Sequence, residues 1–389
     1  MPRPVPRVVR HTLLLLLLFD LASLAATEPT RSALGADDVA KQPPPINFQP
    51  GPEYADSVRM FQGIPGIERA FNGRLWATWY GGGVGEDQNN YVMLVTSDDD
   101  GKTWSRLKLV IDPDRDGPCR AFDPCLWHDP KGRLWLFWAQ RHVSTQLWAM
   151  VTEDSGSENP TWSVPRLIHP GIMLNKPTVL STGAWLLPVA NWGHEGSCGV
   201  LCSTDGGANW RKIGAANIPK RTDRNCDEHM IVERRDGSLW MLVRTSYGIG
   251  QSVSTDQGKT WSEVAPGAIQ HTVARFFIRR LVSGKLLLVK HNAMDNRGDR
   301  SHLTAFLSTD EGKTWQGGLM LDERGEVSYP DAVESPEGGI YVIYDYSRTN
   351  GKQILMATFT EADVAASKCV SSAARLRIVV NQATGVRPK

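Results

Sequence analysis

The stretch Ser97-Asp98-Asp99-Asp100-Gly101-Lys102-Thr103-Trp104 recurs along the chain in the form S-x-D-x-G-x-[TN]-W. Further copies begin at Ser203, Ser254 and Ser308, and a looser copy begins at Thr152. Ser203, Ser254 and Ser308 are 51 and 54 residues apart. The interval between Ser97 and Ser203 is about twice as long, and the looser copy at Thr152 lies within it. A repeat of this length is typical of a solenoid or a propeller, so we interpret the chain as a series of structural repeats.

A second signal repeats independently of the first. A turn glycine followed by an apolar segment occurs six times, at Gly73, Gly132, Gly183, Gly237, Gly284 and Gly338. Each interval holds several short segments rich in aromatic and β-branched residues and punctuated by Gly, Asp and Pro, which is typical of one four-stranded blade. The sequence therefore predicts an all-β fold, a six-bladed β-propeller of four-stranded antiparallel blades, over residues 46–366. Residues 367–389 are assigned to a C-terminal extension, and the tail after Lys368 is either one more short strand or part of that extension.

The repeated motif itself has a structural interpretation. Its Asp and Ser side chains can accept or donate hydrogen bonds within a tight turn, its Gly permits a backbone conformation that other residues avoid, and its Trp can pack beneath the loop. We therefore expect these copies to stabilise hairpins rather than to carry chemistry.

The N-terminal segment predicts export. Arg3, Arg7 and Arg10 precede an apolar run over residues 13–18, and small residues follow up to Ala25. A basic segment, a short apolar segment and small residues are typical of a signal peptide, here over residues 1–25. The run is too short to span a bilayer, so no stable membrane insertion is expected. Residues 26–45 are polar and lack periodicity, which predicts a disordered leader. We expect a secreted or periplasmic protein.

Charge and cysteine usage exclude several functions. The formal net charge is +1, which gives no support to a nucleic-acid partner. No cysteine or histidine spacing is typical of a metal site, and no cofactor is predicted. The six cysteines fall in the exported portion; Cys119 and Cys125 could close a short loop, but we expect mainly buried free thiols.

The repeated motifs resemble the Asp-boxes of the sialidase superfamily, and the resemblance extends from about Phe48 to Asp363. It implies a six-bladed propeller with exo-α-sialidase-like activity, that is, a glycoside hydrolase acting on a glycan or glycoconjugate. The oligomeric state is left open.

Individual residues carry the resemblance further. Residues 228–237 read Glu-His-Met-Ile-Val-Glu-Arg-Arg-Asp-Gly and lead into Arg244. This pattern is similar to a sialidase segment in which Glu228 is the catalytic glutamate and Arg244 binds the substrate carboxylate. Arg300, in Arg-Ser-His-Leu-Thr ahead of a repeat, resembles a second such arginine. Tyr329, in Ser-Tyr-Pro-Asp, resembles the nucleophilic tyrosine, and Tyr344 falls where the family often has Tyr-Glu.

The implied chemistry explains these residue types. The anomeric carbon of sialic acid bears a carboxylate, which would repel a carboxylate nucleophile, whereas a tyrosine deprotonated by a glutamate avoids this repulsion. Arginines supply bidentate hydrogen bonds to the substrate carboxylate. A further carboxyl group must protonate the leaving oxygen. Glu86 and Asp87, in a glycine-rich loop over residues 81–87, are the candidates, with Asp87 preferred.

One position departs from the family. Sialidases begin with Arg-Ile-Pro, whose arginine is the first of a carboxylate-binding triad, and the matching stretch here has Gly63 before Ile64 and Pro65. Arg59, Arg69 or Arg275 could substitute for it. The loss leaves three functions in competition: a retaining sialidase, a hydrolase or lyase of the same fold acting on another sugar, and a non-catalytic carbohydrate-binding propeller.

Overall fold

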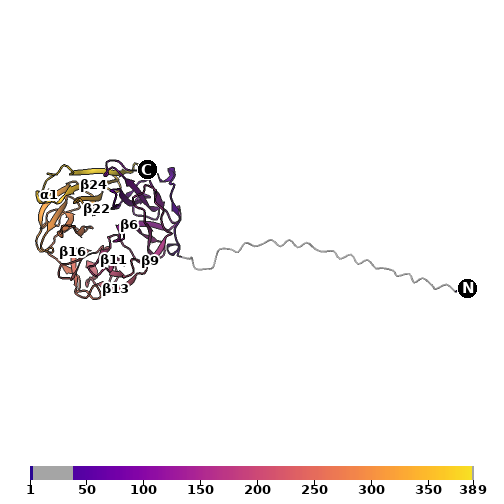
Figure 1. Cartoon of the computed structure of the whole chain (residues 1–389), viewed down its shortest axis with the longest axis horizontal. Coiled ribbons are helices and arrows are strands. Elements are labelled where there is room, and N and C mark those ends of the chain that lie inside the picture. Colours follow the sequence, from indigo (N-terminus) through magenta and orange to yellow (C-terminus); the bar gives the residue numbers. More distant parts are fainter. Residues whose placement is uncertain (3–37, 388–389) are drawn as a thin grey trace. The chain divides into compact units, whose positions relative to one another are not determined.

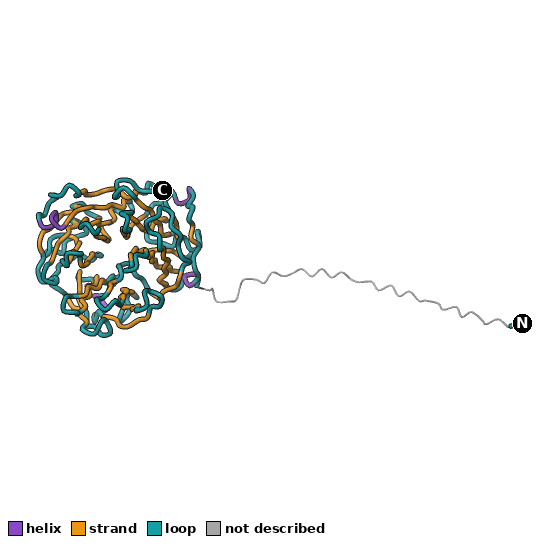
Figure 2. Tube along the Cα trace, viewed as in Figure 1, coloured by secondary structure: helices purple, strands orange, loops and turns teal. Residues whose placement is uncertain are grey.

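The computed structural model describes residues 1–2 and 38–387. From Asp38 onward the chain forms six antiparallel sheets arranged around a central axis (Figure 1). Strands dominate, and α1 (Glu361–Ala365) is the α-helix of this part of the chain (Figure 2). The prediction of a six-bladed propeller with four-stranded antiparallel blades is confirmed.

The first three blades use the strands up to residue 216. In chain order these are β1 (Ile46–Asn47), β2 (Gln62–Arg69), β3 (Leu75–Gly82), β4 (Asn90–Ser97), β5 (Leu109–Ile111), β6 (Arg120–His128), β7 (Leu134–Arg141), β8 (Thr145–Thr152), β9 (Arg166–Pro170), β10 (Thr178–Val179), β11 (Trp185–Ala190), β12 (Cys198–Ser203) and β13 (Arg211–Ala216). β1 pairs with β5 and adds a fifth, outermost strand to the first blade.

The last three blades use the remaining strands. These are β14 (Met230–Glu233), β15 (Leu239–Thr245), β16 (Gly248–Ser254), β17 (Ala265–Pro266), β18 (Phe277–Arg280), β19 (Leu286–His291), β20 (Leu303–Ser308), β21 (Gln316–Asp322), β22 (Val327–Glu334), β23 (Gly339–Tyr346), β24 (Gln353–Thr360) and β25 (Arg375–Gln382). Short 3-10 turns cover Val39–Lys41, Pro52–Tyr54 and Arg221–Asp223.

Apolar side chains between neighbouring blades hold the ring together. One cluster joins the first and second blades, and another joins the first to the sixth, where Leu75 and Ile67 belong to the same cluster as Ile343 and Met356. Strands buried on both faces lose the strict alternation of apolar and polar residues, as β3 and β4 do in the first blade. Because the first and sixth blades share a core, the faces of the first and last sheets cover each other and the ring is closed.

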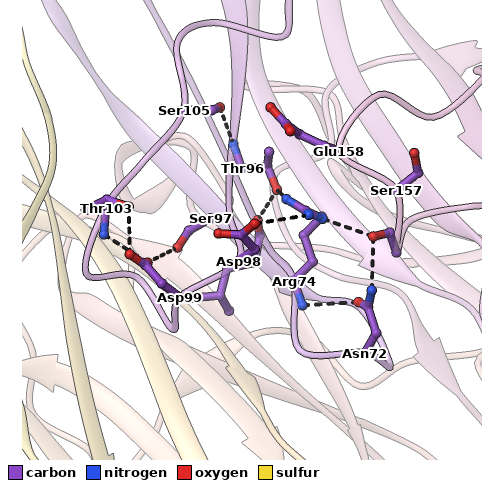
Figure 3. A network of polar contacts seen from close by, with 12 residues as sticks. Asn72, Arg74, Thr96, Ser97, Asp98, Asp99, Thr103, Ser105, Ser157 and Glu158 are labelled. Atoms are coloured by element: carbon purple, nitrogen blue, oxygen red, sulfur yellow. Dashed lines mark hydrogen bonds and ion pairs between the residues drawn. The ribbon is translucent and has the colours of Figure 1, made fainter.

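The repeated motif has the predicted structural role. In the first copy the Asp99 carboxylate accepts hydrogen bonds from Ser97 Oγ at 2.9 Å and from Thr103 N at 2.9 Å, while Ser97 Oγ accepts one from Gly101 N (Figure 3). Gly101 has φ +75°, a conformation that favours glycine. In the same view Arg74 reaches the neighbouring blade, where its Nε donates to Gly156 O at 3.0 Å.

Two predicted boundaries differ from the structure. Residues 38–45, expected in a disordered leader, pack on the second blade, where Trp148 Nε1 donates to Ala40 O at 2.9 Å. The segment after residue 366 contains β25, which pairs with β24 as the outermost strand of the sixth blade, so of the two alternatives for the tail the structure has the further strand. The predicted signal peptide beyond residue 2 lies outside the described residues. No helix in the described part is long and apolar enough to cross a membrane. All six cysteines are free thiols, so the possible bridge between Cys119 and Cys125 is absent.

A buried charge cluster lies where the innermost strands converge. Lys176 Nζ is 2.8 Å from Glu68 Oε1 and 3.2 Å from Asp331 Oδ2, and it also donates to the carbonyls of Ile67 and Leu126. These three ionic side chains are at most 4 % exposed. The cluster therefore links the first, second and sixth blades to the segment that precedes β10.

Candidate active site

Four segments near the axis bend at residues with left-handed backbone conformations. The residues are Ile64, Asp123, Asp227 and Tyr329, with φ of 59°, 49°, 49° and 52°. In β2, β6 and β22 the bend coincides with a shift of strand register. A bulge of this kind changes the direction of a side chain, and a non-glycine residue in this region costs on the order of 1–3 kcal/mol. Such strain is typical of functional sites.

Tyr329, Glu228 and Arg244 form one hydrogen-bonded group. Tyr329 donates from its hydroxyl to Glu228 Oε1 at 3.2 Å. Arg244 Nη1 donates to Glu228 Oε2 at 2.8 Å and to the Tyr329 hydroxyl at 3.1 Å. The three residues are 6 % exposed or less. The structure thus brings together the predicted nucleophile, its base and one predicted anion-binding arginine, although 101 residues separate Glu228 from Tyr329.

The electrostatics of this group favour a protonated tyrosine in the free protein. Burial and the nearby charge of Glu228 raise the pKa of Tyr329, while Arg244 and Arg348 oppose that rise. Burial lowers the pKa of Arg244, but Glu228 and Tyr329 raise it more, so its pKa lies above the ordinary value. A phenol in this environment ionises only if a base receives its proton, and Glu228 is within hydrogen-bonding distance to do so.

Two further arginines flank Tyr329. The guanidinium carbon of Arg300 lies 5.9 Å from the centre of the Tyr329 ring, and that of Arg348 lies 5.4 Å from it. Both arginines line a cavity of about 550 Å³ together with Phe61, Glu86 and Ser328. Arg300 donates to Ser328 Oγ at 3.3 Å and to Val273 O at 3.1 Å. The cavity therefore places two guanidinium groups beside the buried tyrosine, in a lining that also contains the carboxylates of Asp299 and Glu326.

The two candidate acids on the glycine-rich loop differ in their surroundings. Asp87 accepts hydrogen bonds from the backbone N–H groups of Val84, Gly85 and Asn89 at 2.9, 3.2 and 2.9 Å, so its carboxylate organises the loop. Glu86 lines the cavity and forms an ion pair with Arg348. The geometry favours Glu86 over Asp87, the residue preferred from the sequence, as the group that can reach a ligand.

Two predicted substrate-binding residues lie elsewhere. Arg275 donates to Asn175 Oδ1 at 2.7 Å and to the carbonyls of Pro330 and Leu174 at 2.7 and 2.9 Å, so it braces the backbone behind Tyr329. Tyr344 is buried in the core and donates to Asp322 Oδ2 at 3.2 Å. Successive strand residues point to opposite faces, so when Tyr344 faces the core its neighbour Asp345 faces the site.

The alternatives for the missing arginine also lie outside the cavity. Arg59 is fully buried and donates to Gln62 Oε1 and to Tyr54 O at 3.1 and 2.6 Å. Arg69 is at the other end of β2 from Gly63 and lies 3.8 Å from Glu337. Neither belongs to the group around Tyr329.

Comparison with known proteins agrees with this architecture. Residues 73–342 match the model of the BNR repeat-like domain family. The chain belongs to the BNR repeat-like family of the sialidase superfamily. A sialidase of Bacteroides fragilis (strain YCH46) is 26% identical over 331 residues, which cover 73% of this chain and 60% of the relative. The chain thus matches less than two thirds of that relative's length.

Solved structures share the same fold. A Hadza microbial sialidase superposes with a TM-score of 0.64 at 21% identity, covering 79% of this chain and 67% of the other. An intramolecular trans-sialidase from Ruminococcus gnavus superposes with a TM-score of 0.65 at 17% identity, covering 80% of this chain and 97% of the other. At these identities the similarity concerns the fold alone.

Three residues at the site of this BNR repeat-like protein were missed from the sequence. Arg348 follows β23 in a turn that belongs to no repeated motif. Asp123 is buried on β6, and burial together with the charge of Glu86 raises its pKa well above the ordinary value. Burial and the charge of Glu228 raise the pKa of the Cys226 thiol to about 12. Only the three-dimensional arrangement relates these residues to Tyr329.

Proposed function

We propose that the protein is an exo-acting, retaining glycosidase that removes a terminal acidic sugar from a glycan, with sialic acid as the first candidate. The observation that carries this proposal is the contact between the Tyr329 hydroxyl and Glu228 Oε1, bridged by Arg244. The relatives' sialidase names support the same reaction class. A binding protein has no need for a buried tyrosine paired with a base.

In the first half-reaction the Tyr329 oxygen attacks the anomeric carbon while Glu228 accepts the phenolic proton. The bond between that carbon and the leaving oxygen breaks, and Glu86 donates a proton to the leaving oxygen. Arg244 and Arg300 bind the carboxylate carried by the same carbon, since guanidinium groups bind carboxylates through charge-assisted hydrogen bonds. The product is a glycosyl-tyrosine and a free alcohol.

In the second half-reaction a water molecule replaces the alcohol. The carboxylate of Glu86 accepts a proton from this water as the water oxygen attacks the anomeric carbon. The tyrosine oxygen leaves and recovers its proton from Glu228. Each half-reaction inverts the anomeric configuration, so the two together retain it. Export to the cell exterior or periplasm, expected from the N-terminal sequence, would bring the enzyme to its glycans.

A second candidate is cleavage of a different acidic sugar. Gly63 favours this second candidate, because the position that carries the first carboxylate-binding arginine in the family pattern has no side chain in this protein. Such a substrate would still need a carboxylate near the anomeric carbon to use Arg244 and Arg300.

The experiment that tests the proposal measures sugar release from a fluorogenic sialoside by wild-type protein and by Tyr329→Phe. We expect the variant to lose at least about a thousandfold in kcat, since removal of a nucleophile leaves only binding and electrostatic contributions. Tyr344→Phe is the matched control, because it removes a buried hydroxyl outside the cavity.

Equal turnover by Tyr329→Phe and wild type would contradict the nucleophile assignment. If folded wild-type protein releases no sialic acid, a panel of other glycosides with a carboxylate on the anomeric carbon decides between the two candidates. Failure on the whole panel would overturn the glycosidase proposal.

A further inference from the structure

Gly63 and Arg348 occupy overlapping space. A Cβ added to Gly63 would lie 2.4 Å from Cδ and 2.7 Å from Cγ of Arg348, and 2.9 Å from Oδ2 of Asp345. Real Cβ atoms essentially never approach other heavy atoms closer than 3.0 Å. Any side chain at position 63 would therefore displace Arg348 from its present position.

Arg348 is held at the edge of the cavity by groups from two blades. Its guanidinium carbon lies 5.9 Å from the centre of the Phe61 ring as well as 5.4 Å from that of Tyr329. Asp345, which is fully buried, anchors the same region because its Oδ2 accepts a hydrogen bond from Ile64 N at 2.8 Å. Burial alone lowers the pKa of Arg348, but Asp345, Tyr329 and Glu86 raise it above its ordinary value. The guanidinium is therefore charged and directed at the site.

The three arginines around Tyr329 differ in what already binds them. Arg244 is paired with the buried carboxylate of Glu228, and Arg300 donates to a hydroxyl and a carbonyl. Arg348 is paired with Glu86, whose side chain is 46% exposed and sits on the glycine-rich loop. An exposed ion pair is weak and exchanges readily with another anion. Of the two arginines that are paired with a carboxylate, Arg348 therefore has the partner that a ligand carboxylate can more easily replace.

We propose that Arg348 supplies the third guanidinium of the anion-binding site, that Gly63 is the residue that makes room for it, and that the substrate carboxylate displaces Glu86 from Arg348. This inference rests on the proposed function and names the groups that recognise its acidic sugar. Displacement also frees the Glu86 carboxylate from its cation, so that it can take up a proton from solvent and then donate that proton to the leaving oxygen. Carboxylate binding and acid catalysis are thereby coupled through one ion pair.

The test measures binding of an unreactive probe, the 2,3-unsaturated analogue of N-acetylneuraminic acid, by calorimetry. We expect Arg348→Met to bind it at least tenfold more weakly than wild type. Gly63→Ala should show a similar loss, and the double variant should be no worse than Arg348→Met, because both changes remove the same guanidinium. The methyl ester of the probe, which lacks the carboxylate charge, should not distinguish the variants. Arg69→Met is the control, since it removes a cation at the opposite end of β2, and it should bind as wild type does.

Thermal unfolding supplies a readout that does not depend on the ligand. Gly63→Ala should lower the Tm more in the wild-type background than in the Arg348→Gly background, where the two closest collisions are gone and only the 2.9 Å approach to Asp345 Oδ2 remains. Additive losses of probe binding, unchanged binding by Arg348→Met, or an equal Tm effect in both backgrounds would each overturn the inference. If wild-type protein neither binds the probe nor cleaves any acidic glycoside, the proposed function fails, whereas the steric exchange between Gly63 and Arg348 is still decided by the unfolding data.

Discussion

Lys176 offers a direct test of how the buried charge cluster stabilises the propeller. Its ammonium group donates to Glu68 Oε1 at 2.8 Å and to the carbonyls of Ile67 and Leu126 at 2.6 and 2.7 Å, and lies 3.2 Å from Asp331 Oδ2. Lys176→Met keeps most of the side-chain volume and removes the charge. The substitution leaves the buried carboxylate of Glu68 without its ammonium partner, while Asp331 keeps Arg275 at 3.7 Å.

The magnitude follows from this geometry. Removal of one partner from a buried ion pair costs about 3–5 kcal/mol, because the remaining charge stays desolvated. We therefore expect Lys176→Met to lower the free energy of unfolding by about 3–5 kcal/mol at pH 7. Lys285→Met is the matched control: its partner Glu361 and Lys285 itself are 21% and 37% exposed, so its loss should be about 0–1 kcal/mol.

The effect must also depend on pH. Burial tends to raise the pKa of Glu68, but Lys176 and His128 lower it from 4.5 to about 2. In the wild-type protein the contribution of Glu68 to stability is thus present above pH 4.5 and is lost as the pH falls toward 2. Without Lys176 burial raises this pKa, so the variant gains stability as the carboxyl group becomes protonated. The difference between the two proteins should narrow from pH 7 to pH 4.

Urea unfolding followed by tryptophan fluorescence at pH 7 and pH 4 measures both effects. The double variant Lys176→Met/Glu68→Gln should recover part of the loss at pH 7, because the buried charge of Glu68 that lost its ammonium partner is gone. A loss below about 1 kcal/mol at pH 7, the range of exposed pairs, would refute the reasoning. A difference that does not change between the two pH values would refute the role of Glu68.

Three further predictions concern protons elsewhere in the molecule. Glu86→Gln should lower kcat for a sialoside with a sugar leaving group by about 10²–10⁴-fold, and much less for a good phenolic leaving group, when the two substrates are compared at one pH. Hydrogen bonds within the repeated motifs lower the pKa of four aspartates to about 2: Asp99, Asp205, Asp256 and Asp310. The stability that these carboxylates contribute is therefore present above pH 3.8 and is lost as the pH falls toward 2. Asp256→Asn should weaken this dependence of Tm on pH, measured in a pH series. Burial lowers the pKa of Lys290 from 10.5 to about 8. Between these pH values the unfolded chain binds more protons than the folded protein, so the free energy of unfolding should rise with pH. Urea unfolding at pH 8 and pH 10 should show this rise in the wild-type protein and no rise in Lys290→Met.

The repeats made the fold predictable from sequence because each copy determines a local structure. The Ser, Asp and Gly of one motif satisfy each other's hydrogen bonds within one hairpin, as Ser97, Asp99 and Gly101 do. Each motif is complete within a short stretch of sequence, so its copies can be recognised and counted along the chain. The sixth blade lacks the motif, so no repeat marks its last strand, and the boundary predicted at residue 366 falls short of β25.

The site was predictable only in part, for a related reason. Glu228, Arg244 and Tyr329 were found because each stands in a recognisable local pattern, and they meet in the structure. The roles of Arg275 and Tyr344 depend on which way a side chain faces and on what already binds it. Arg275 meets two backbone carbonyls and Tyr344 meets Asp322, and no pattern of neighbouring residues reports those partners.

Gly63 shows why a missing residue in a motif is ambiguous in a closed ring. When the sequence is compared with the family pattern position by position, Gly63 in place of arginine means the loss of a positive charge from the first blade. Closure of the ring brings the turn after β23 of the sixth blade against β2, where Gln62 N donates to Arg348 O at 3.2 Å. A guanidinium can therefore enter the same space from a residue far away in the sequence, provided that position 63 has no side chain. The glycine at position 63 and the arginine at position 348 are then two parts of one arrangement. Only their contact in three dimensions relates the two positions.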